Sequence, residues 1–144
     1  MTSGVQFAAE PSPRYLLGFD IGGTKCATIL GRVSRDGINI VDRVSFATEH
    51  GTGPNGVLAM LETDARKTLA GAGLETVDVE RVGISCGGPL DAKRGVVLGP
   101  PNLPGWDHVE VTAHFERVLG IEAKLANAAN AGALAEWWWG AGRG

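Results

Sequence analysis

The feature that most constrains the fold of this chain is a double glycine, Gly22-Gly23, set between two runs of strand-forming residues. The run before it, Leu16–Ile21, is largely apolar but includes Asp20, and the run after it, Cys26–Val33, is short and lacks helical periodicity. A double glycine between two such runs is typical of a β-hairpin turn. A P-loop or a dinucleotide-binding turn would instead need a helix directly after the glycines. The stretch therefore predicts a strand, a tight turn and a second strand.

The residues around this turn are suited to binding a phosphate group. Glycines at the tip of a hairpin let a phosphate approach the backbone, with successive N–H groups pointing at it. Thr24 adds a hydroxyl donor and Lys25 a positive charge. Asp20 is an anion beside a phosphate, which makes sense mainly where Mg²⁺ or its water shell lies between the two. A Gly-Gly pair alone also occurs in ordinary hairpins, so the interpretation depends on the whole string from Asp20 to Lys25.

The rest of the chain predicts an α/β fold with a mixed five-stranded sheet and packed helices. An Asp36-Gly37 turn and an alternating run complete a three-stranded antiparallel meander, and two later strands each follow a helix. Prolines exclude helix or central strand from Gly99–Trp106, which is interpreted as a rigid loop. The expected elements after the meander's second turn are a strand at Ile38–Phe46, a loop at Thr48–Gly56, a helix at Val57–Leu69, a strand at Val79–Cys86, a short return strand at Gly95–Leu98, a helix at Val111–Leu119, a strand at Ile121–Ala126 and an alanine-rich helix through Trp138.

Composition and charge narrow the classes of partner. The 144 residues carry a net charge of −3, which provides no basic field for nucleic acid or an anionic membrane. No segment has the pattern of a signal peptide or an apolar stretch long enough to span a bilayer. Cys26 and Cys86 lie in apolar runs, which favours buried free thiols in a reducing compartment, with a disulfide as the alternative. These observations predict a cytoplasmic protein with a flexible leader at residues 1–14 and one domain at residues 15–144.

Four motifs, in order along the chain, resemble those of the ROK family of sugar kinases and related repressors. The motifs are Asp20–Lys25, Gly83–Asp91, Pro101–Trp106 and Asn127–Asn130 leading into Ala135-Glu136, and the resemblance covers Leu17–Gly144. It implies one half of an actin-like ATPase or ribonuclease H-like fold. It also implies a glucokinase-like enzyme that transfers the γ-phosphate of ATP-Mg²⁺ to a hydroxyl of a hexose or hexosamine.

The resemblance assigns roles to individual residues. The phosphate end of ATP would contact Asp20, Gly22, Gly23, Thr24 and Lys25, with Asp20 binding Mg²⁺ indirectly. The backbone of Gly87, Gly88 and Pro89 would approach the sugar, and the side chains of Asn102 and Asn127 would hydrogen-bond its hydroxyls. An amide both donates and accepts, so each asparagine can serve a hydroxyl in either role. The same residue types also form plain turns and helix caps, which is the structural alternative.

The chain departs from the family pattern at Ala128. Where the family has Asn-Asp-Ala-Asn, this sequence has Asn127-Ala128-Ala129-Asn130, and the family's Asp is the general base that takes the proton from the sugar hydroxyl. A methyl group cannot accept a proton, and loss of a general base slows a reaction by about 10²- to 10⁴-fold. Two explanations stay open at this point: an engineered substitution that traps substrate, or a naturally degenerate kinase-like protein.

The resemblance also implies parts that this sequence does not contain. Chains of the family continue into a second domain with the nucleotide site and a His and Cys cluster that binds zinc, so zinc is expected only there. Here His50, His108 and His114 lack cysteines at ligand spacing and are interpreted as surface residues. Trp137–Trp139 would fan around a helix, which predicts an exposed apolar patch, self-association and a homo-oligomer. The isolated chain is expected to be inactive.

Two other functions remain as alternatives. A sugar-responsive transcriptional regulator of the same family would need a helix-turn-helix before the first strand, and Met1–Arg14 is too short to hold one. A non-catalytic sugar-binding module is favoured by Ala128 and by the missing second domain. Sugar titration separates these hypotheses, because a module binds sugar without turnover.

Overall fold

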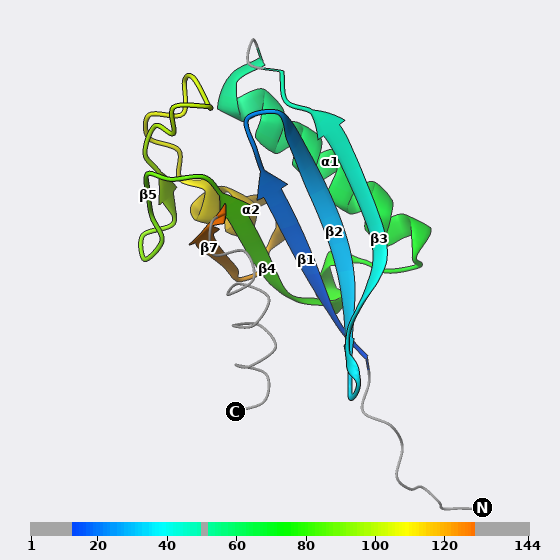
Figure 1. The fold of residues 1–144 in the computed structure, drawn as a ribbon. Coiled ribbons are helices and arrows are strands. Elements are labelled where there is room, and N and C mark those ends of the chain that lie inside the picture. Colours follow the sequence, from blue (N-terminus) through cyan, green and yellow to red (C-terminus); the bar gives the residue numbers. More distant parts are fainter. Residues whose placement is uncertain (1–12, 50–51, 129–144) are drawn as a thin grey trace, which may run out of the picture.

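The computed structural model of the chain describes residues 13–49 and 52–128, and its centre is one mixed sheet. The strand order is β3-β2-β1-β4-β7 (Figure 1). The strands are β1 (Arg14–Ile21), β2 (Lys25–Ser34), β3 (Gly37–Ala47), β4 (Val79–Cys86) and β7 (Ala123–Asn127). β1 pairs antiparallel with β2, and β2 antiparallel with β3, whereas β4 runs parallel to both β1 and β7. The predicted mixed sheet with a three-stranded meander is therefore confirmed, and the double glycine forms the β1–β2 turn.

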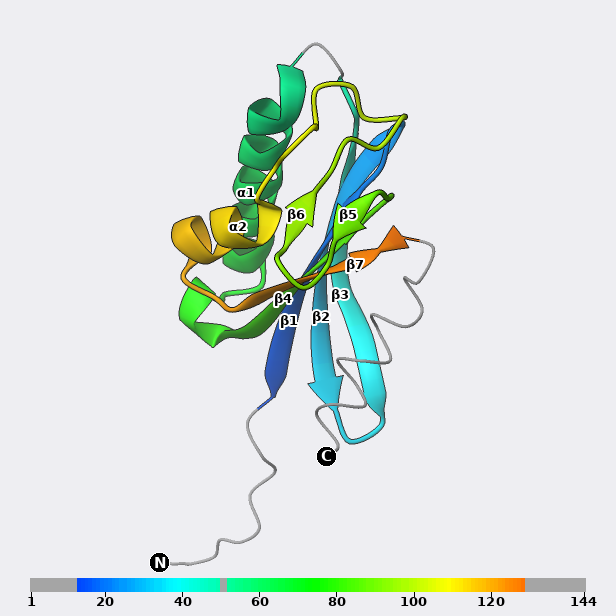
Figure 2. The same ribbon diagram turned by 90° about the vertical axis from the view of Figure 1, so that its left-hand side faces the viewer.

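Two helices cover one face of this sheet, as Figure 2 shows for α1 (Gly53–Gly71) and α2 (Val111–Leu119). α2 has the predicted bounds and ends at Gly120, whose φ of 71° is the left-handed conformation that glycine adopts without strain. α1 begins earlier than predicted, inside the expected loop Thr48–Gly56. Pro54 in its first turn explains the difference, because the missing N–H of proline has no intrahelical partner there.

The core lies between the sheet and the two helices. On β1, Leu17, Phe19 and Ile21 are buried, and the ring of Phe19 stacks on Phe115 of α2 with centroids 4.2 Å apart. Leu58, Leu61, Ala65 and Leu69 form the buried stripe of α1. Since side chains alternate along a strand, Gly18 and Asp20 point to the face of the sheet away from the helices. The β1 strand thus places Asp20 outside the helix-covered core.

A small second sheet and an anchored loop complete the described fold. β5 (Leu90–Asp91) and β6 (Val96–Val97) pair antiparallel, which confirms the predicted return strand. A 3₁₀ turn, η2 (Thr76–Asp78), precedes β4. In the proline-rich loop, Leu103 and Trp106 are 1% and 2% exposed, so these two side chains fix the loop to the core. Asn102, directly before Leu103, is exposed.

The two cysteines are free and buried, as predicted. Cys26 on β2 and Cys86 on β4 are both register partners of Ile21, one on each side of β1. Two strand spacings separate their Cα atoms by roughly 9.5 Å, whereas a disulfide spans at most about 7 Å between Cα atoms. A disulfide between them would therefore require the sheet to open.

Some predictions fall outside the described residues. These are the flexible leader up to residue 12, His50, the alanine-rich helix beyond Ala128 and the Trp137–Trp139 patch. Within residues 13–49 and 52–128, no helix has the length and apolar character needed to cross a membrane.

Candidate active site

The tip of the β1–β2 hairpin presents free backbone donors. The Gly22 N–H donates to the Lys25 carbonyl at 3.1 Å, so this first amide is used to close the turn. The next two amides, those of Gly23 and Thr24, donate to no acceptor in the described part of the chain. Successive unpaired N–H groups at a turn form an anion-binding concavity. Two such donors are able to bind a phosphate oxygen, and phosphate binding by this turn stays a prediction.

The glycine at the centre of the tip is required by a close approach to the proline-rich loop. A Cβ atom built on Gly23 would lie 2.6 Å from the carbonyl oxygen of Asn102 and 2.9 Å from its Nδ2 atom. A Cβ on Gly22 would lie 2.8 Å from the Lys25 carbonyl oxygen. The contact shows that the tip of the β1–β2 hairpin (Gly22–Lys25), for which the sequence predicts phosphate binding and which is called the phosphate turn below, and the loop bearing Asn102 lie side by side.

Asp20 lies one residue before the turn region, next to an unsatisfied hydroxyl. It is half-buried, and its register partners are Ala27 on β2 and Ser85 on β4. Ser85 is only 7% exposed, and its Oγ atom has no hydrogen-bond partner among residues 13–49 and 52–128. A water molecule bound to Mg²⁺ can donate one hydrogen bond to a carboxylate and another to the oxygen of a neighbouring hydroxyl. Asp20 and Ser85 therefore fit a magnesium ion bound through water, while Thr24 and Lys25 are exposed at the tip.

The Gly87–Pro89 segment lies beside Asn127, the last residue of β7, at the same end of the sheet. It follows β4 directly, and the Gly88–Pro89 peptide bond is cis. A Cβ on Gly88 would lie 2.8 Å from Nδ2 of Asn127, and one on Gly87 would lie 4.0 Å from Oδ1 of Asn102. Because β1, β4 and β7 are parallel, their carboxyl ends meet at one edge of the sheet, where ligands of α/β proteins bind. The residues predicted from four separate motifs are thus brought together.

Ala128 follows the last residue of β7 and is exposed. It therefore lies at the same edge as Asn127, and its methyl group provides no acid or base there. The Cys86 thiol cannot replace that base. Burial above all, then the neighbouring Cys26 and Asp20, raise the pKa of Cys86 to about 12, against the lowering effect of the Gly87 backbone. Cys86 is a protonated core group in this site.

The histidines contribute to other parts of the surface. His108 is exposed, with its Nε2 atom 3.6 Å from Oε2 of Glu110. His114 is half-buried, packs edge-on against Phe115 and lines a hollow of the surface, so it is less exposed than His108. Burial, and next the Arg117 guanidinium, lower the pKa of His114. In the segments 13–49 and 52–128, no three His, Cys, Asp or Glu side chains are grouped to bind a metal ion.

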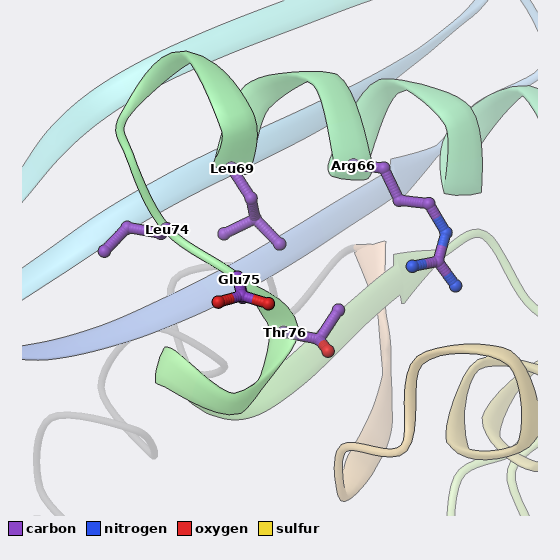
Figure 3. A pocket seen from close by; sticks show the side chains of 5 residues that line it. All are labelled: Arg66, Leu69, Leu74, Glu75 and Thr76. Atoms are coloured by element: carbon purple, nitrogen blue, oxygen red, sulfur yellow. The ribbon is translucent and has the colours of Figure 1, made fainter.

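Two hollows lie elsewhere on the helix side. One, of about 210 Å³, is lined by Arg66, Leu69, Leu74, Glu75 and Thr76 between α1 and η2 (Figure 3). Its Arg66 guanidinium is already paired, with Glu62 at 3.1 Å and with the Val118 carbonyl at 2.8 Å. The other, of about 400 Å³, is lined by residues of α1, α2 and the preceding loop, among them Asn55, His108 and Arg117. Neither includes a residue of the hairpin tip or of the Asn102–Asn127 edge.

Two residues of the site are not apparent from the sequence. One is Ser85, which only the register with Asp20 reveals. The other is Thr48, directly after β3, whose hydroxyl donates to the Gly22 carbonyl at 2.7 Å and whose N–H donates to the Thr24 carbonyl at 2.9 Å. A hydroxyl residue at a strand end gives only a weak sequence signal, because such residues commonly form turns.

Comparison with known proteins agrees with this geometry. The profile of the ROK family matches residues 16–144, so the chain belongs to the ROK family. Over 132 residues it is 36% identical to a glucokinase of Thermotoga maritima, covering 90% of this chain and 38% of that protein. The chain therefore spans about two fifths of the length of this curated relative.

Solved structures agree on the fold. A ROK family transcriptional regulator, a homologue of the E. coli MLC protein, superposes with a TM-score of 0.66 at 19% identity, covering 86% of this chain and 30% of that one. A glucokinase from Parabacteroides distasonis superposes with a TM-score of 0.64 at 21% identity, covering 79% of this chain and 30% of that one. At these identities the likeness concerns architecture, and it identifies the sheet and its helices as one half of an actin-like fold.

Proposed function

We propose that residues 15–144 are the sugar-binding, phosphate-loop half of an ATP-dependent hexose kinase of the glucokinase type. The observation that carries the proposal is the contact of the phosphate turn with the Asn102 loop, beside the Gly88–Asn127 contact. A kinase needs the donor phosphate and the acceptor hydroxyl next to each other, since positioning and electrostatics supply most of its catalysis. The likeness to the Thermotoga glucokinase supports the same activity.

In this proposal each group at the sheet edge has one role. Asn102 and Asn127 hydrogen-bond sugar hydroxyls, and the backbone of Gly87–Pro89 lets the sugar approach closely. The amides of Gly23 and Thr24, with the charge of Lys25, hold the terminal phosphates of ATP. Mg²⁺ supplies neutralisation of the phosphate charge when bound, and Asp20 orients the metal's water. The second half of the nucleotide site, and any zinc, belong to a further domain.

Ala128 determines what this chain can do in the assembled enzyme. Its position beside Asn127 is where a carboxylate would accept the proton of the attacking hydroxyl. Without that base we expect a rate lower by about 10²- to 10⁴-fold. The chain by itself is proposed to bind sugar without transferring phosphate.

The test uses sugar binding and a gain of function. Calorimetric titration of the 144-residue chain with glucose, N-acetylmannosamine and fructose should show binding of a hexose, and Asn102→Ala should weaken it. In a chain that includes the second domain, Ala128→Asp should raise sugar-dependent ATP consumption. The control is Asn55→Ala, which changes an amide in the helix-side hollow and should leave sugar affinity unchanged. No hexose binding by the chain, or no rise with Ala128→Asp, contradicts the proposal.

A second candidate is a sugar-binding module that never phosphorylates, and Ala128 is the observation that favours it. A sugar-responsive regulator is a separate alternative, and a ROK family transcriptional regulator shares the fold of this chain. The two candidates differ in the Ala128→Asp experiment, because a module lacking other catalytic groups stays inactive after the base is restored. Homo-oligomer formation and a cytoplasmic location stay predictions.

A further inference from the structure

Thr48 holds two carbonyl groups of the hairpin tip, those of Gly22 and Thr24. Its Oγ1 atom donates to the Gly22 carbonyl oxygen at 2.7 Å, and its backbone N–H donates to the Thr24 carbonyl oxygen at 2.9 Å. The Cys26 thiol lies 3.2 Å from the same Oγ1 atom and 3.8 Å from the Gly22 oxygen. The thiol of Cys26 thus packs against the same pair of oxygen atoms, those of the Thr48 hydroxyl and the Gly22 carbonyl. Thr48, directly after β3, therefore fixes the orientation of two carbonyl groups of the turn, those of Gly22 and Thr24.

The orientation of a carbonyl determines that of the next amide. In a trans peptide unit the C=O and the following N–H point in opposite directions. The Gly22 carbonyl and the Gly23 N–H belong to one such unit, so holding that carbonyl against Thr48 turns the Gly23 N–H to the other side. In an ordinary two-residue hairpin the Gly22 carbonyl would accept from the Lys25 N–H, a bond that does not form among the described residues.

A rotation of this peptide unit would weaken anion binding in two ways. It would remove the Gly23 donor and would present a carbonyl oxygen, with its partial negative charge, to the phosphate. Glycine at positions 22 and 23 permits such rotation at little steric cost within the turn itself, because it lacks a Cβ atom. The turn therefore depends on a partner outside its own four residues to stay in the donor-presenting orientation.

We propose that Thr48 is a positioning residue for the phosphate turn. It acts through the Gly22–Gly23 peptide unit, keeping the Gly22 carbonyl away from the phosphate and the Gly23 N–H toward it. The inference rests on the proposed function, since it assumes that the turn binds phosphates. It adds to the proposed phosphate site a residue that directly follows β3 and lies outside the four motifs that carry the family resemblance.

The experiment measures phosphate binding by the 144-residue chain. Backbone amide resonances of the ¹⁵N-labelled chain are followed by NMR while magnesium tripolyphosphate is added. In the unchanged chain the Gly23 and Thr24 resonances should shift with the added ligand. Thr48→Val removes the hydroxyl but keeps side-chain shape and the backbone N–H, and should raise the apparent Kd about tenfold, the effect of losing roughly one hydrogen bond's contribution. Thr48→Ser restores the hydroxyl and should bind within about threefold of the unchanged chain.

A matched control separates positioning from simple stabilisation. Thr52→Val removes a threonine hydroxyl that also donates to a backbone carbonyl at 2.7 Å, but that carbonyl belongs to Glu49 and not to a residue of the hairpin tip. It should leave tripolyphosphate binding unchanged. The glucose affinity of Thr48→Val should also stay unchanged. A general loss of folding would instead lower the affinities for tripolyphosphate and for glucose together. If Thr48→Val does not fold, Thr48→Ala removes the same hydroxyl with less bulk.

Each outcome decides between the hypotheses. Shifts at the tip in the unchanged chain, lost selectively in Thr48→Val or Thr48→Ala and recovered in Thr48→Ser, support the positioning role. Equal affinity of the unchanged chain and the Thr48→Val chain refutes that role and leaves the phosphate site standing. Absence of tip shifts in the unchanged chain refutes the phosphate site itself, and the positioning role with it.

Discussion

Substitution of Gly23 by alanine tests the contact that joins the two halves of the site. The new Cβ would lie 2.6 Å from the Asn102 carbonyl oxygen, 2.8 Å from the Asn102 Cβ and 2.9 Å from its Nδ2. Contacts below 3.0 Å force one partner to move, and the nearest atom belongs to the backbone of the loop. Gly23 has no positive φ, so the effect of the substitution comes from this clash and not from strained dihedral angles.

Neither partner of the clash can move freely. The Asn102 loop is fixed by Leu103 and Trp106, which are 1% and 2% exposed, so its displacement would uncover core side chains. The tip is held by the hydrogen bonds of Thr48 to Gly22 and Thr24. Overpacking in well-packed sites destabilises proteins by about 1–3 kcal/mol, and the double restraint here places Gly23→Ala at about 2–3 kcal/mol. That is a large part of the 5–15 kcal/mol typical of whole domains.

The assay combines urea denaturation with glucose titration. Gly23→Ala should lower the free energy of unfolding by the stated amount and weaken glucose binding, because Asn102 is displaced. Gly71→Ala is the control, since a Cβ there meets nothing within 4 Å and alanine favours helix more than glycine does. Unchanged stability and unchanged glucose affinity for Gly23→Ala would refute the contact between tip and loop.

The remaining predictions concern the core. Phe115→Ala removes the ring stacked on Phe19 and should lower the free energy of unfolding by about 3–5 kcal/mol. The control is Val77→Ala, at a residue that is 85% exposed, which should change the free energy of unfolding by less than about 0.5 kcal/mol. Similar effects of the two substitutions would disprove the packing of Phe115 in the core. Burial raises the pKa of Cys86 from 9.0 to about 12, so the unfolded chain loses this proton first as pH rises. The stabilising contribution of the protonated thiol is complete below pH 9 and should decline between pH 9 and 12, and urea midpoints over this range should fall less steeply for Cys86→Ala than for the unchanged chain. Equal slopes for the two chains would count against the buried thiol.

Local signals in the sequence predicted much of the fold. The double glycine gave the hairpin, and the strand at Val79–Cys86 and the helix at Val111–Leu119 have their predicted ends because Gly87 and Gly120 stop them. The start of α1 was misplaced because the polar, glycine-rich run before Val57 resembles a loop, and the preference of Pro54 for a first helical turn was given too little weight.

The arrangement of the site depends on contacts between distant segments. The motifs suggested Asn102 and Asn127 as ligands, but their contacts with Gly23 and Gly88 follow from tertiary packing that one sequence does not encode locally. Likewise, the orphaned hydroxyl of Ser85 matters only because the β1–β4 register places it beside Asp20. Thr48 enters the site only because β3 pairs with β2 up to Ala47, next to the tip.

Sugar binding is proposed at the edge of the sheet where Asn102 and Asn127 lie beside the phosphate turn. The most direct measurement is a glucose titration of the ¹⁵N-labelled chain, followed through the side-chain amide resonances of its asparagines. The Asn102 and Asn127 side-chain resonances should shift together with the Gly87 and Gly88 amide resonances, while the side-chain resonance of Asn55 should stay fixed. Shifts confined to Asn55 and its neighbours in the helix-side hollow, with Asn102 and Asn127 unmoved, would contradict it.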